Sequence, residues 1–485
     1  MKQKIFTGII AIFCLSAVYA QEPRLESGMK FDFNAEQEEN PAFVLVDDYN
    51  HYLVTDINIH GMLNIHKILI RKFDQANQLL ETFTQEFPKI DANTLYNYNG
   101  AFEIGNGKLA IFTNIYSNKA KKQEVYMHIF DKKSAAFTTT KIADFAIESA
   151  MKSANVNVVA SENGRYIGIK IQKDKTKTEP FTDEIIIWDA ATSSQVWNKK
   201  VEFIDKYVDK SFAVTNSGKA VILRQGEGFN MHNYLVVVTA DKQEEKQFED
   251  KIMLHKPRVV TIGSKEYLID FNYPAKGLRA GDYDNFIFYD LEAGKTIVNN
   301  KLDVGVFSKT PEIKEVYIRS IFLQNDEIHI FAEGRVRAGS REEKVNAMSS
   351  TTMTVDYYKF SPARQIVLGF DGNLKKVTNI NVGSSQHLTN LYFSFGVVNV
   401  RGEYYINSDG ARGLYDLNSG KKMIIDAKTD QERERNSRIL RGDTESSSKE
   451  YVNQLCFYIN NSRKLVVARI HPDKRMSLLS IFDPF

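Results

Sequence analysis

Residues able to carry out chemistry are spread thinly along this chain of 485 residues. Zinc sites are usually built from closely spaced His or Cys pairs. The nine histidines form no His-x-His or His-x-x-x-His pair, and the two nearest, His60 and His66, lie six positions apart. The sequence also lacks a Gly-x-Ser-x-Gly nucleophile elbow and a phosphate-binding loop. The sequence therefore predicts no catalytic residue, no metal ligand and no cofactor-binding residue.

Three weaker candidates have simpler interpretations. The stretch Asp282-Tyr283-Asp284-Asn285 lacks the Gly and the bidentate Glu of a complete calcium loop, so we interpret it as a solvated loop. The tripeptide Arg441-Gly442-Asp443 lies within the mixed-charge stretch QERERNSRILRGDTESSSKE, which indicates a chance occurrence. Cys456 lies in the apolar stretch LCFYI and is typical of a small buried side chain rather than of a nucleophile.

The first twenty residues have the pattern of a secretory signal peptide. Lys2 and Lys4 precede an apolar run that ends at Leu15, and small side chains at Val18 and Ala20 are typical of a cleavage site after Ala20. The apolar run is shorter than the roughly 20 residues that span a bilayer, and no later segment approaches that length. We therefore expect export through a signal peptide cleaved after Ala20. The destination, whether periplasm, outer-membrane association or the extracellular space, stays open.

The charge of the expected mature chain is balanced. Loss of Lys2 and Lys4 reduces the 63 basic residues to 61, equal to the 61 acidic residues. A balanced charge gives no reason to expect nucleic acid or an anionic membrane surface as the main partner. Cys456 would be the one remaining cysteine, so the fold cannot depend on an intramolecular disulfide.

Two sequence landmarks repeat eight times and indicate the elements that must position any site. The first landmark is a hydrophobic residue followed by Asp at the end of an apolar run, with spacings of 57, 58, 52, 49, 81, 45 and 67 residues. The eight acids are Asp74, Asp131, Asp189, Asp241, Asp290, Asp371, Asp416 and Asp483.

The second landmark is a tight polar turn before an apolar run, as in GNGKLAIF, ENGRYIGI and NSGKAVIL. Such turns predict β-hairpins, because Gly tolerates the positive φ that they need. In three copies, the turn glycine precedes its Asp by 24, 25 and 23 residues, from Gly107, Gly164 and Gly218. Each unit therefore predicts four antiparallel strands, the third of which ends in Asp.

The strands are apolar in continuous runs such as LAIF, EIIIW and YLVVV, which indicates sheets buried on both faces. Stacking such sheets around an axis gives an all-β fold, the β-propeller. We predict eight four-stranded blades in a single domain over residues 21–485, and seven blades if the short seventh unit merges with a neighbour. The units span about residues 42–90, 99–145, 156–203, 210–252, 257–305, 316–380, 390–427 and 452–485.

The eighth unit ends at Asp483-Pro484-Phe485 without a fourth strand. Near the expected mature amino terminus, the segment MKFDF alternates apolar and polar residues. We predict that residues 29–34 supply the missing outer strand of the last blade. Sharing one blade between the two ends of the chain would close the ring and hide two sheet edges.

The segment WDAATSSQVW resembles the blade motif of quinoprotein-like propellers, Asp-Ala-x-Thr-Gly-x-x-x-Trp, with Ser193 where Gly is usual. YDLEAGKTI and YDLNSGKKM are similar to it and also to WD-repeat and YVTN-type blades, and SENGRYIGI resembles the hairpin of TolB-like propellers. The resemblance implies a packing role for this motif, and no cofactor cage is matched. In such units the Asp accepts hydrogen bonds from backbone N–H groups of the following turn, so we interpret the eight acids as structural.

Three segments depart from the repeat. The sixth unit contains about twenty extra residues, the fifth contains NYPAKGLRAGDYDN, and the connector over residues 428–450 is strongly charged. One interpretation is solvated, partly disordered loops. The alternative is a partner surface on one face of the ring, because Arg and Tyr are enriched in binding hot spots. Its candidate residues are Arg335, Arg337, Arg341, Tyr273, Arg279 and Tyr283.

These observations predict an exported, non-enzymatic propeller of the bacterial cell envelope that binds or scaffolds a protein or a glycan, with an envelope complex as one setting for that role. The alternative is a propeller hydrolase or lyase that acts on glycans or peptides with a site over the central channel. That alternative predicts acidic and basic residues converging in a concave pocket at one mouth of the channel.

Overall fold

The structure is a computed structural model. It describes residues 25–34, 38–59, 65–92, 94–149, 152–173, 181–203, 207–226, 232–248, 252–254, 256–274, 285–301, 315–344, 352–380, 386–387, 395–408, 413–420, 422–423, 451–471 and 475–482. Within these residues the protein is all-β, and no α-helix occurs. The predicted signal peptide, Arg279, Tyr283, Asp483 and the connector over residues 428–450 lie outside them.

Each blade is one antiparallel sheet, and the blades are numbered from β3 onward. Blade 1 consists of β3 (Glu38–Val44), β4 (Asn50–Ile59), β5 (Ile65–Asp74) and β6 (Leu79–Glu86). Blade 2 consists of β7 (Thr94–Ile104), β8 (Lys108–Ser117), β9 (Lys122–Asp131) and β10 (Ala136–Ala146). Blade 3 consists of β11 (Asn155–Ala160), β12 (Tyr166–Gln172), β13 (Phe181–Asp189) and β14 (Ser194–Phe203). Blade 4 consists of β15 (Tyr207–Val214), β16 (Ala220–Gly226), β17 (Asn233–Val238) and β18 (Gln243–Gln247).

Blade 5 has its first strand in two pieces, β19 (Ile252–Leu254) and β20 (Arg258–Ile262), followed by β21 (Lys265–Pro274), β22 (Asn285–Asp290) and β23 (Lys295–Lys301). Blade 6 consists of β24 (Glu315–Gln324), β25 (Glu327–Lys344), β26 (Thr352–Gly369) and β27 (Leu374–Ile380), and β28 (Gln386–His387) pairs with β26. Blade 7 consists of β29 (Phe395–Val400), β30 (Glu403–Ser408), β31 (Gly413–Asp416) and β32 (Lys422–Met423). Blade 8 consists of β33 (Tyr451–Ile459), β34 (Lys464–His471) and β35 (Arg475–Phe482), completed by β1 (Leu25–Ser27) and β2 (Phe31–Asp32).

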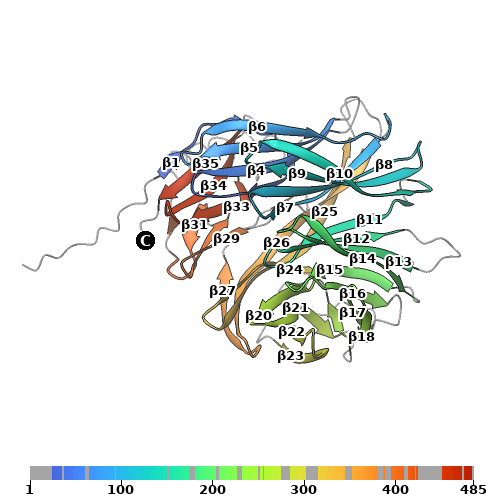
Figure 1. Cartoon of the computed structure of the whole chain (residues 1–485). Helices are drawn as coiled ribbons and strands as arrows, with labels where there is room; N and C mark the ends of the chain where they lie inside the picture. The colour runs from blue at the N-terminus through green and yellow to red at the C-terminus, as the bar shows by residue number, and fades with distance from the viewer. Residues whose placement is uncertain are drawn as a thin grey trace, which may run out of the picture.

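The eight sheets follow one another around a ring, from blue to red in Figure 1. Eight hydrophobic clusters fill the ring, one at each junction between neighbouring blades. The predicted eight-bladed β-propeller is therefore confirmed, and the short seventh unit forms its own sheet instead of merging with a neighbour.

Each central strand contributes side chains to two junctions. In β16, Val221 and Leu223 belong to the cluster shared with blade 5, whereas Ala220 and Ile222 belong to the cluster shared with blade 3. Successive side chains of a strand point to opposite faces of its sheet, so a blade covered on both faces needs an apolar residue at every position. Burial of one Val or Leu side chain contributes about 1.5–3 kcal/mol. This explains the continuous apolar runs of the sequence.

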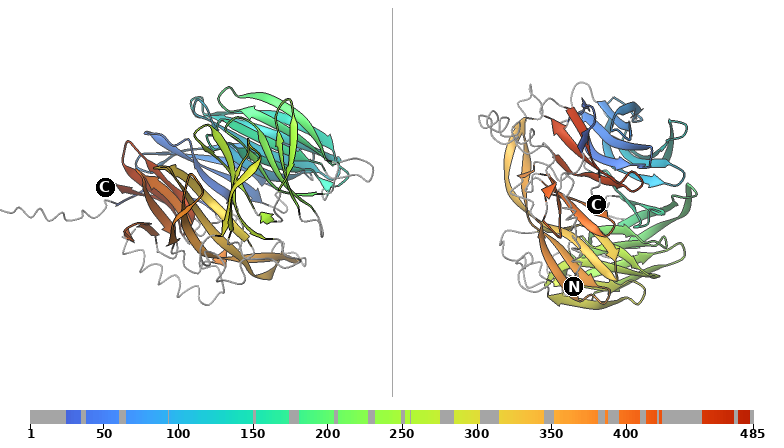
Figure 2. Two further views of the ribbon diagram at one scale, coloured as in Figure 1. Left: turned by 90° about the horizontal axis from the view of Figure 1, so that it is seen from below. Right: turned by 90° about the vertical axis from the view of Figure 1, so that its left-hand side faces the viewer.

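The amino-terminal segment completes blade 8, as predicted. In the antiparallel register, Leu25 of β1 lies opposite Ile481 of β35, and Phe31 of β2 lies opposite Met476. Only part of the predicted segment over residues 29–34 is strand, and β1 lies just before it. Figure 2 shows the red strands near the carboxyl terminus beside the blue strands of blade 1, which is the seam where the ring closes.

A buried ion pair of blade 1 lies at this seam. Arg71 of β5 binds the Glu38 carboxylate of β3 through two hydrogen bonds of 2.7 and 2.9 Å, and it also donates to the Asp32 carbonyl oxygen of β2 at 3.1 Å. Thr55 donates to the same carboxylate at 3.0 Å. The guanidinium also lies over the Phe31 ring, 5.6 Å from its centroid. The bidentate pair holds Arg71 in place within blade 1, and the contacts of Arg71 with Asp32 and Phe31 attach the outer strand of blade 8 to blade 1.

Six of the eight blade acids accept hydrogen bonds from backbone N–H groups of the following turn: Asp74, Asp131, Asp189, Asp290, Asp371 and Asp416. In blade 3, Asp189 Oδ1 accepts from the Ala191 N–H at 2.8 Å and from the Thr192 N–H at 3.0 Å. These two bonds and the Arg165 side chain hold the pKa of Asp189 below its usual value. Within the described residues, the Asp241 carboxylate accepts no such bond, and Asp483 lies outside them.

The described extra residues of the sixth unit form strands, which corrects the interpretation of this segment as a solvated loop. β25 and β26 pair with each other from Glu327 opposite Gly369 out to Lys344 opposite Thr352. They form the long light-orange hairpin in Figure 1. In this hairpin the backbone N–H and C=O groups pair across the two strands, whatever side chains the strands carry. The strands therefore need no apolar run, and the apolar pattern of the sequence did not reveal them.

Candidate functional site

The first strand of each blade lies nearest the central axis, because neighbouring first strands contact one another, as β7 does with β3 and with β11. Every blade repeats the same strand order, so the first strands all begin on the same face of the ring. We call this the entry face. The opposite face carries the hairpin turns between first and second strands, and we call it the turn face.

β-Bulges or similar register irregularities interrupt the first strands of five blades, in β3, β7, β15, β24 and β33. A bulge inserts an extra residue and redirects the side chains near it, and bulges are enriched beside functional sites. The bulge in β3 contains Asn40, and the bulge in β7 is at Asn99. Both residues line one pocket.

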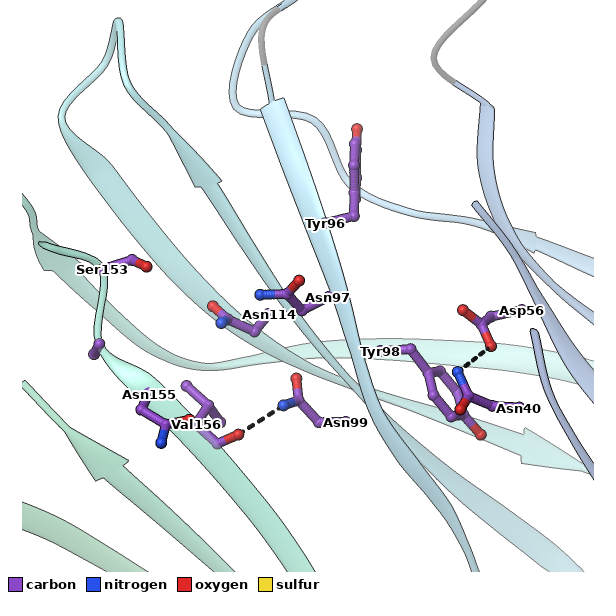
Figure 3. A pocket seen from close by; sticks show the side chains of 11 residues that line it. Asn40, Asp56, Tyr96, Asn97, Tyr98, Asn99, Asn114, Ser153, Asn155 and Val156 are labelled. Carbon is purple, nitrogen blue, oxygen red and sulfur yellow. Dashed lines mark hydrogen bonds between the residues drawn. The ribbon is translucent and has the colours of Figure 1, made fainter. Parts of the chain in front are cut away.

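This pocket lies at the entry face across blades 1, 2 and 3 and has a volume of about 440 Å³ (Figure 3). Its described lining consists of Asn40, Asp56, Tyr96, Asn97, Tyr98, Asn99, Asn114, Ser153, Ala154, Asn155 and Val156. Five of these residues carry side-chain amides. The volume falls within the range of about 300–1,000 Å³ that is usual for ligand sites.

Two hydrogen bonds hold the lining in place. Asn99 Nδ2 donates to the Val156 carbonyl oxygen at 2.7 Å, which ties blade 2 to blade 3. Asn40 Nδ2 donates to Asp56 Oδ1 at 2.9 Å within blade 1. Figure 3 draws both bonds. The Asn40 amide therefore occupies one oxygen of the one carboxylate in the described lining.

Behind the lining, Gln123 of β9 positions two pocket residues. Its side chain is fully buried. The amide nitrogen donates to Asn114 Oδ1 at 2.8 Å and to the Ala154 carbonyl oxygen at 2.9 Å, and the amide oxygen accepts from the Ala154 N–H at 2.7 Å. A buried amide with these bonds satisfied holds its neighbours in one geometry. The wall between blades 2 and 3 is thus organised without a ligand.

The two lining tyrosines are neutral hydrogen-bonding groups with apolar rings. Burial raises the pKa of Tyr98 far above its usual value. Burial and the charge of Asp91 also raise the pKa of Tyr96. The Tyr96 ring stacks on His66 with centroids 4.0 Å apart. Both phenols therefore stay protonated at neutral pH.

The pocket is suited to binding by hydrogen bonds. Each Asn amide both donates and accepts, as do the Tyr and Ser hydroxyls. Among the described lining residues there is one carboxylate, Asp56, and no Lys, Arg or His. Within the part of the chain that the structure describes, no three His, Cys, Asp or Glu side chains lie close enough together to hold a metal ion. The same residues include no helix with the length and hydropathy of a membrane span.

None of the residues predicted to bind a partner is among the described lining of this pocket. Arg335, Arg337 and Arg341 lie on β25, opposite Phe360, Tyr358 and Val355 of β26. Tyr273 lies on β21, and Arg279 and Tyr283 lie outside the described residues. Their role in binding stays a prediction. Cys456, predicted to be buried, is half-buried against the cluster between blades 7 and 8. Desolvation raises the pKa of its thiol to about 12, which disfavours the reactive thiolate.

No protein-family model matches this sequence, and no curated protein matches it. Solved structures with a similar fold include Sqt1 from Chaetomium thermophilum, at 10% identity and a TM-score of 0.46, covering 95% of this chain and 100% of that chain. The β-propeller domain of the Trilobed protease from Pyrococcus furiosus is similar at 12% identity and a TM-score of 0.35, covering 71% of this chain and 96% of that one.

The acylaminoacyl peptidase from Pyrococcus horikoshii is similar at 8% identity and a TM-score of 0.35, covering 78% of this chain. This chain spans 59% of that peptidase. At these identities and scores the likenesses carry no argument about function. The fold assignment rests on the eight sheets themselves.

Proposed function

We propose that this protein is an exported, non-enzymatic binding module whose entry-face pocket recognises a hydroxyl-rich ligand, with a glycan as the fitting class. One observation carries the proposal: five side-chain amides, two phenols and one serine hydroxyl line a single concave site across three blades. The cleavable signal peptide predicted from the sequence supports a place in the bacterial cell envelope, where glycans are abundant.

The chemistry of the lining matches a carbohydrate. Neighbouring sugar hydroxyls each donate one hydrogen bond and accept others, and an amide meets both needs with one side chain. The apolar face of a sugar ring can pack against an aromatic ring, and Tyr98 is the candidate here, because the Tyr96 ring is buried and stacked on His66. Gln123 and Asn99 hold the walls of the pocket in place before any ligand binds. Binding would therefore lose little side-chain conformational entropy.

The first experiment measures binding of envelope polysaccharides and their oligosaccharide fragments to the protein by calorimetry. Asn97 and Asn155 are the substitution targets, because they line the pocket and belong to different blades. Asn97→Ala and Asn155→Ala should each weaken binding by about 5- to 10-fold, the cost of one or two hydrogen bonds. Asn198→Ala, an exposed change on the outer strand of blade 3, is the matched control and should bind normally.

The proposal fails if no glycan binds, or if a bound glycan is insensitive to both pocket variants. A second measurement tests the location: fractionation of the native cell and amino-terminal sequencing of the protein should find it outside the cytoplasm, beginning at Gln21. Retention of residues 1–20 in the cytoplasmic fraction would contradict the proposed export.

The alternative function, a glycan hydrolase or lyase at the same site, makes a distinct prediction. Most glycosidases use two carboxylates on either side of the scissile bond. The described lining has Asp56, which is bonded to Asn40. Incubation of a bound oligosaccharide with the protein should return it intact. Release of shorter products, abolished by Asp56→Asn, would favour the enzyme.

A further inference from the structure

A second pocket lies inside the central channel. Its described lining comes from the first strands of blades 2 to 6, at β7, β11, β15, β20 and β24, together with the turn that follows β11. In a ring of eight blades, blade 2 and blade 6 are on opposite sides, so the space between β7 and β24 is the channel itself. The volume is about 480 Å³.

Most of the residues that line this channel pocket are apolar, and the exposed backbone and the side chains of Ser161, Glu162 and Arg258 add polar surface. The apolar residues include Phe102, Val158, Phe212, Val214, Val260 and Ile321. This composition contrasts with the amides of the entry-face pocket. Apolar walls with a few placed polar groups are the usual composition of small-molecule sites.

Arg258 of β20 is the one cationic side chain in the described lining. Within the described residues, no hydrogen bond or ion pair reaches its guanidinium group. Its side chain is exposed to the space of the channel, while protein surrounds it on the other sides. This partial desolvation, together with the positive charge of Arg319, lowers the pKa of Arg258, while Glu162 partly offsets the effect. Arg319 itself is paired with Glu333 of β25. A guanidinium that is accessible from the channel can receive the carboxylate of a ligand.

The rim of the channel pocket on the turn face is held by two neighbouring turns and the end of β20. The Asn163 N–H donates to Asn216 Oδ1 at 3.0 Å, Asn216 Nδ2 donates to Thr261 Oγ1 at 2.7 Å, and the Thr261 N–H donates to Glu162 Oε2 at 2.9 Å. These bonds link blades 3, 4 and 5 and engage the Glu162 carboxylate with the backbone. The rim is therefore fixed, and Arg258 faces a pocket of defined shape.

We propose that the channel pocket binds a small amphipathic monocarboxylate, with the apolar body against the channel walls and the carboxylate on Arg258. A guanidinium binds a carboxylate through two parallel hydrogen bonds, which gives orientation as well as affinity. A free fatty acid and the carboxyl terminus of an apolar peptide share this chemistry. The site is separate from the entry-face pocket and does not depend on the glycan proposal.

Calorimetry with decanoate tests the carboxylate and the apolar body together. Decanoate should bind with one site per chain, and decanol, which has the same apolar body, should bind at least tenfold more weakly. Arg258→Gln should weaken decanoate binding at least tenfold and leave decanol binding unchanged. Lys265→Gln, an exposed change at the start of β21, is the matched control and should bind decanoate normally.

Peptides distinguish the two sources of the carboxylate. An apolar hexapeptide with a free carboxyl terminus should bind more tightly than its amidated form, which lacks the carboxylate. If the free peptide binds more tightly than decanoate, the natural ligand is a peptide terminus. If decanoate binds more tightly, the natural ligand is a fatty acid. Arg258→Lys keeps the charge without the paired geometry and should lose part of the affinity. The proposal is overturned if decanoate and decanol bind equally, if Arg258→Gln binds decanoate normally, or if no carboxylate probe binds.

Discussion

Two junctions of the ring bury charge in different ways. At the seam between blades 8 and 1, Arg71 and Glu38 form a bidentate pair, and each side chain is 6% exposed. The remaining hydrogen-bonding capacity is used by Thr55 and by the Asp32 carbonyl oxygen. This is one cation with one anion, in a geometry that satisfies both.

The junction between blades 3 and 4 instead buries two cations and two carboxylates. Asp209 Oδ1 accepts from Arg224 Nε at 2.7 Å, and Asp209 Oδ2 accepts from Lys170. Asp183 lies nearby, with its Oδ2 3.7 Å from Lys170 Nζ. That distance is too long for a normal hydrogen bond, and neither Asp183 oxygen has a donor among the described residues. Asp209 therefore accepts hydrogen bonds from both cations, whereas Asp183 accepts none from the described residues.

The difference shows that a buried charge strengthens a blade junction when its hydrogen bonds are complete, and makes the junction sensitive to pH when they are not. Burial raises the pKa of Asp183 to about 6, Lys170 opposes this rise, and the neighbouring Asp209 adds to it. The seam joins the two ends of the chain and has the complete pair. The junction of blades 3 and 4 joins blades already connected in sequence.

The largest expected effect comes from removing the apolar anchors of the seam. Phe31 and Phe33 are 5% and 1% exposed and pack against blade 1. The double change Phe31→Ala and Phe33→Ala should lower the free energy of unfolding by more than about 5 kcal/mol, since each buried Phe costs about 3–5 kcal/mol. Urea denaturation measures the loss. Met29→Ala, in the same segment but 68% exposed, should have little effect.

Breaking the seam pair should have the next largest effect. Arg71→Ala leaves the Glu38 carboxylate buried without its cation and should cost about 3–5 kcal/mol. Arg475→Ala is the control, because this residue lies on the same seam but its side chain is half-exposed, 3.8 Å from Asp32. Equal stability of the two variants in urea would contradict the role given to the buried pair.

The blade 3–4 junction should respond to pH instead. The pKa of Asp183 in the folded state, about 6, lies above its usual 3.8. The folded state therefore binds the proton more tightly, and stability should fall as pH rises through the window from about 4 to 6, by up to about 3 kcal/mol. Asp183→Asn should remove this dependence.

The pKa of Asp209 is lowered by Lys170 and Arg224 despite its burial, so its own contribution is lost at lower pH, below about 4. The two acids can thus be separated by denaturation midpoints measured from pH 3 to 8. A slope between pH 4 and 6 that persists in Asp183→Asn would assign the effect to another group. Glu184→Gln, at the next position of β13, is the matched control.

The smallest expected effect concerns the turn acids, which recur in blades around the ring and do not belong to one junction. Asp189→Ala removes two hydrogen bonds to backbone N–H groups and should cost about 1–2 kcal/mol. Asp241→Ala removes no such bond among the described residues and should change stability by less than about 0.5 kcal/mol. A similar cost for the two variants would show that the bonds at Asp189 do not stabilise its turn.

The fold was predictable because its signals are local. The turns at Gly107, Gly164 and Gly218 have φ values of 70°, 68° and 78°, which favour glycine, and each is followed by an apolar strand. The order of these signals along the chain sufficed to predict eight blades. Even the closure of the ring was predictable, because blade 8 lacked one strand and the amino-terminal segment had the alternation of an outer strand.

The entry-face pocket was not predictable, because its residues come from three blades and have no common spacing. Asn40, Asn97 and Asn155 lie on separate first strands, and Asn40 and Asn99 reach the pocket through bulges that the apolar pattern does not reveal. The stretch YNYNG, with two amides in a first strand where apolar residues are expected, is the one local signal that could have pointed to this site. Arg258 likewise has no distinguishing neighbours in the sequence.

The pairing of β1 with β35 has a consequence for folding kinetics. Leu25 and Ile481, which lie opposite each other, are 456 positions apart (481 minus 25). Contacts between such distant positions form slowly, because the intervening chain must first be ordered. A chain can stack seven blades while the eighth still lacks its outer strand, so we expect docking of β1 and β2 to come last. Until then two strand edges would stay unpaired, and a chaperone would have to shield them from aggregation.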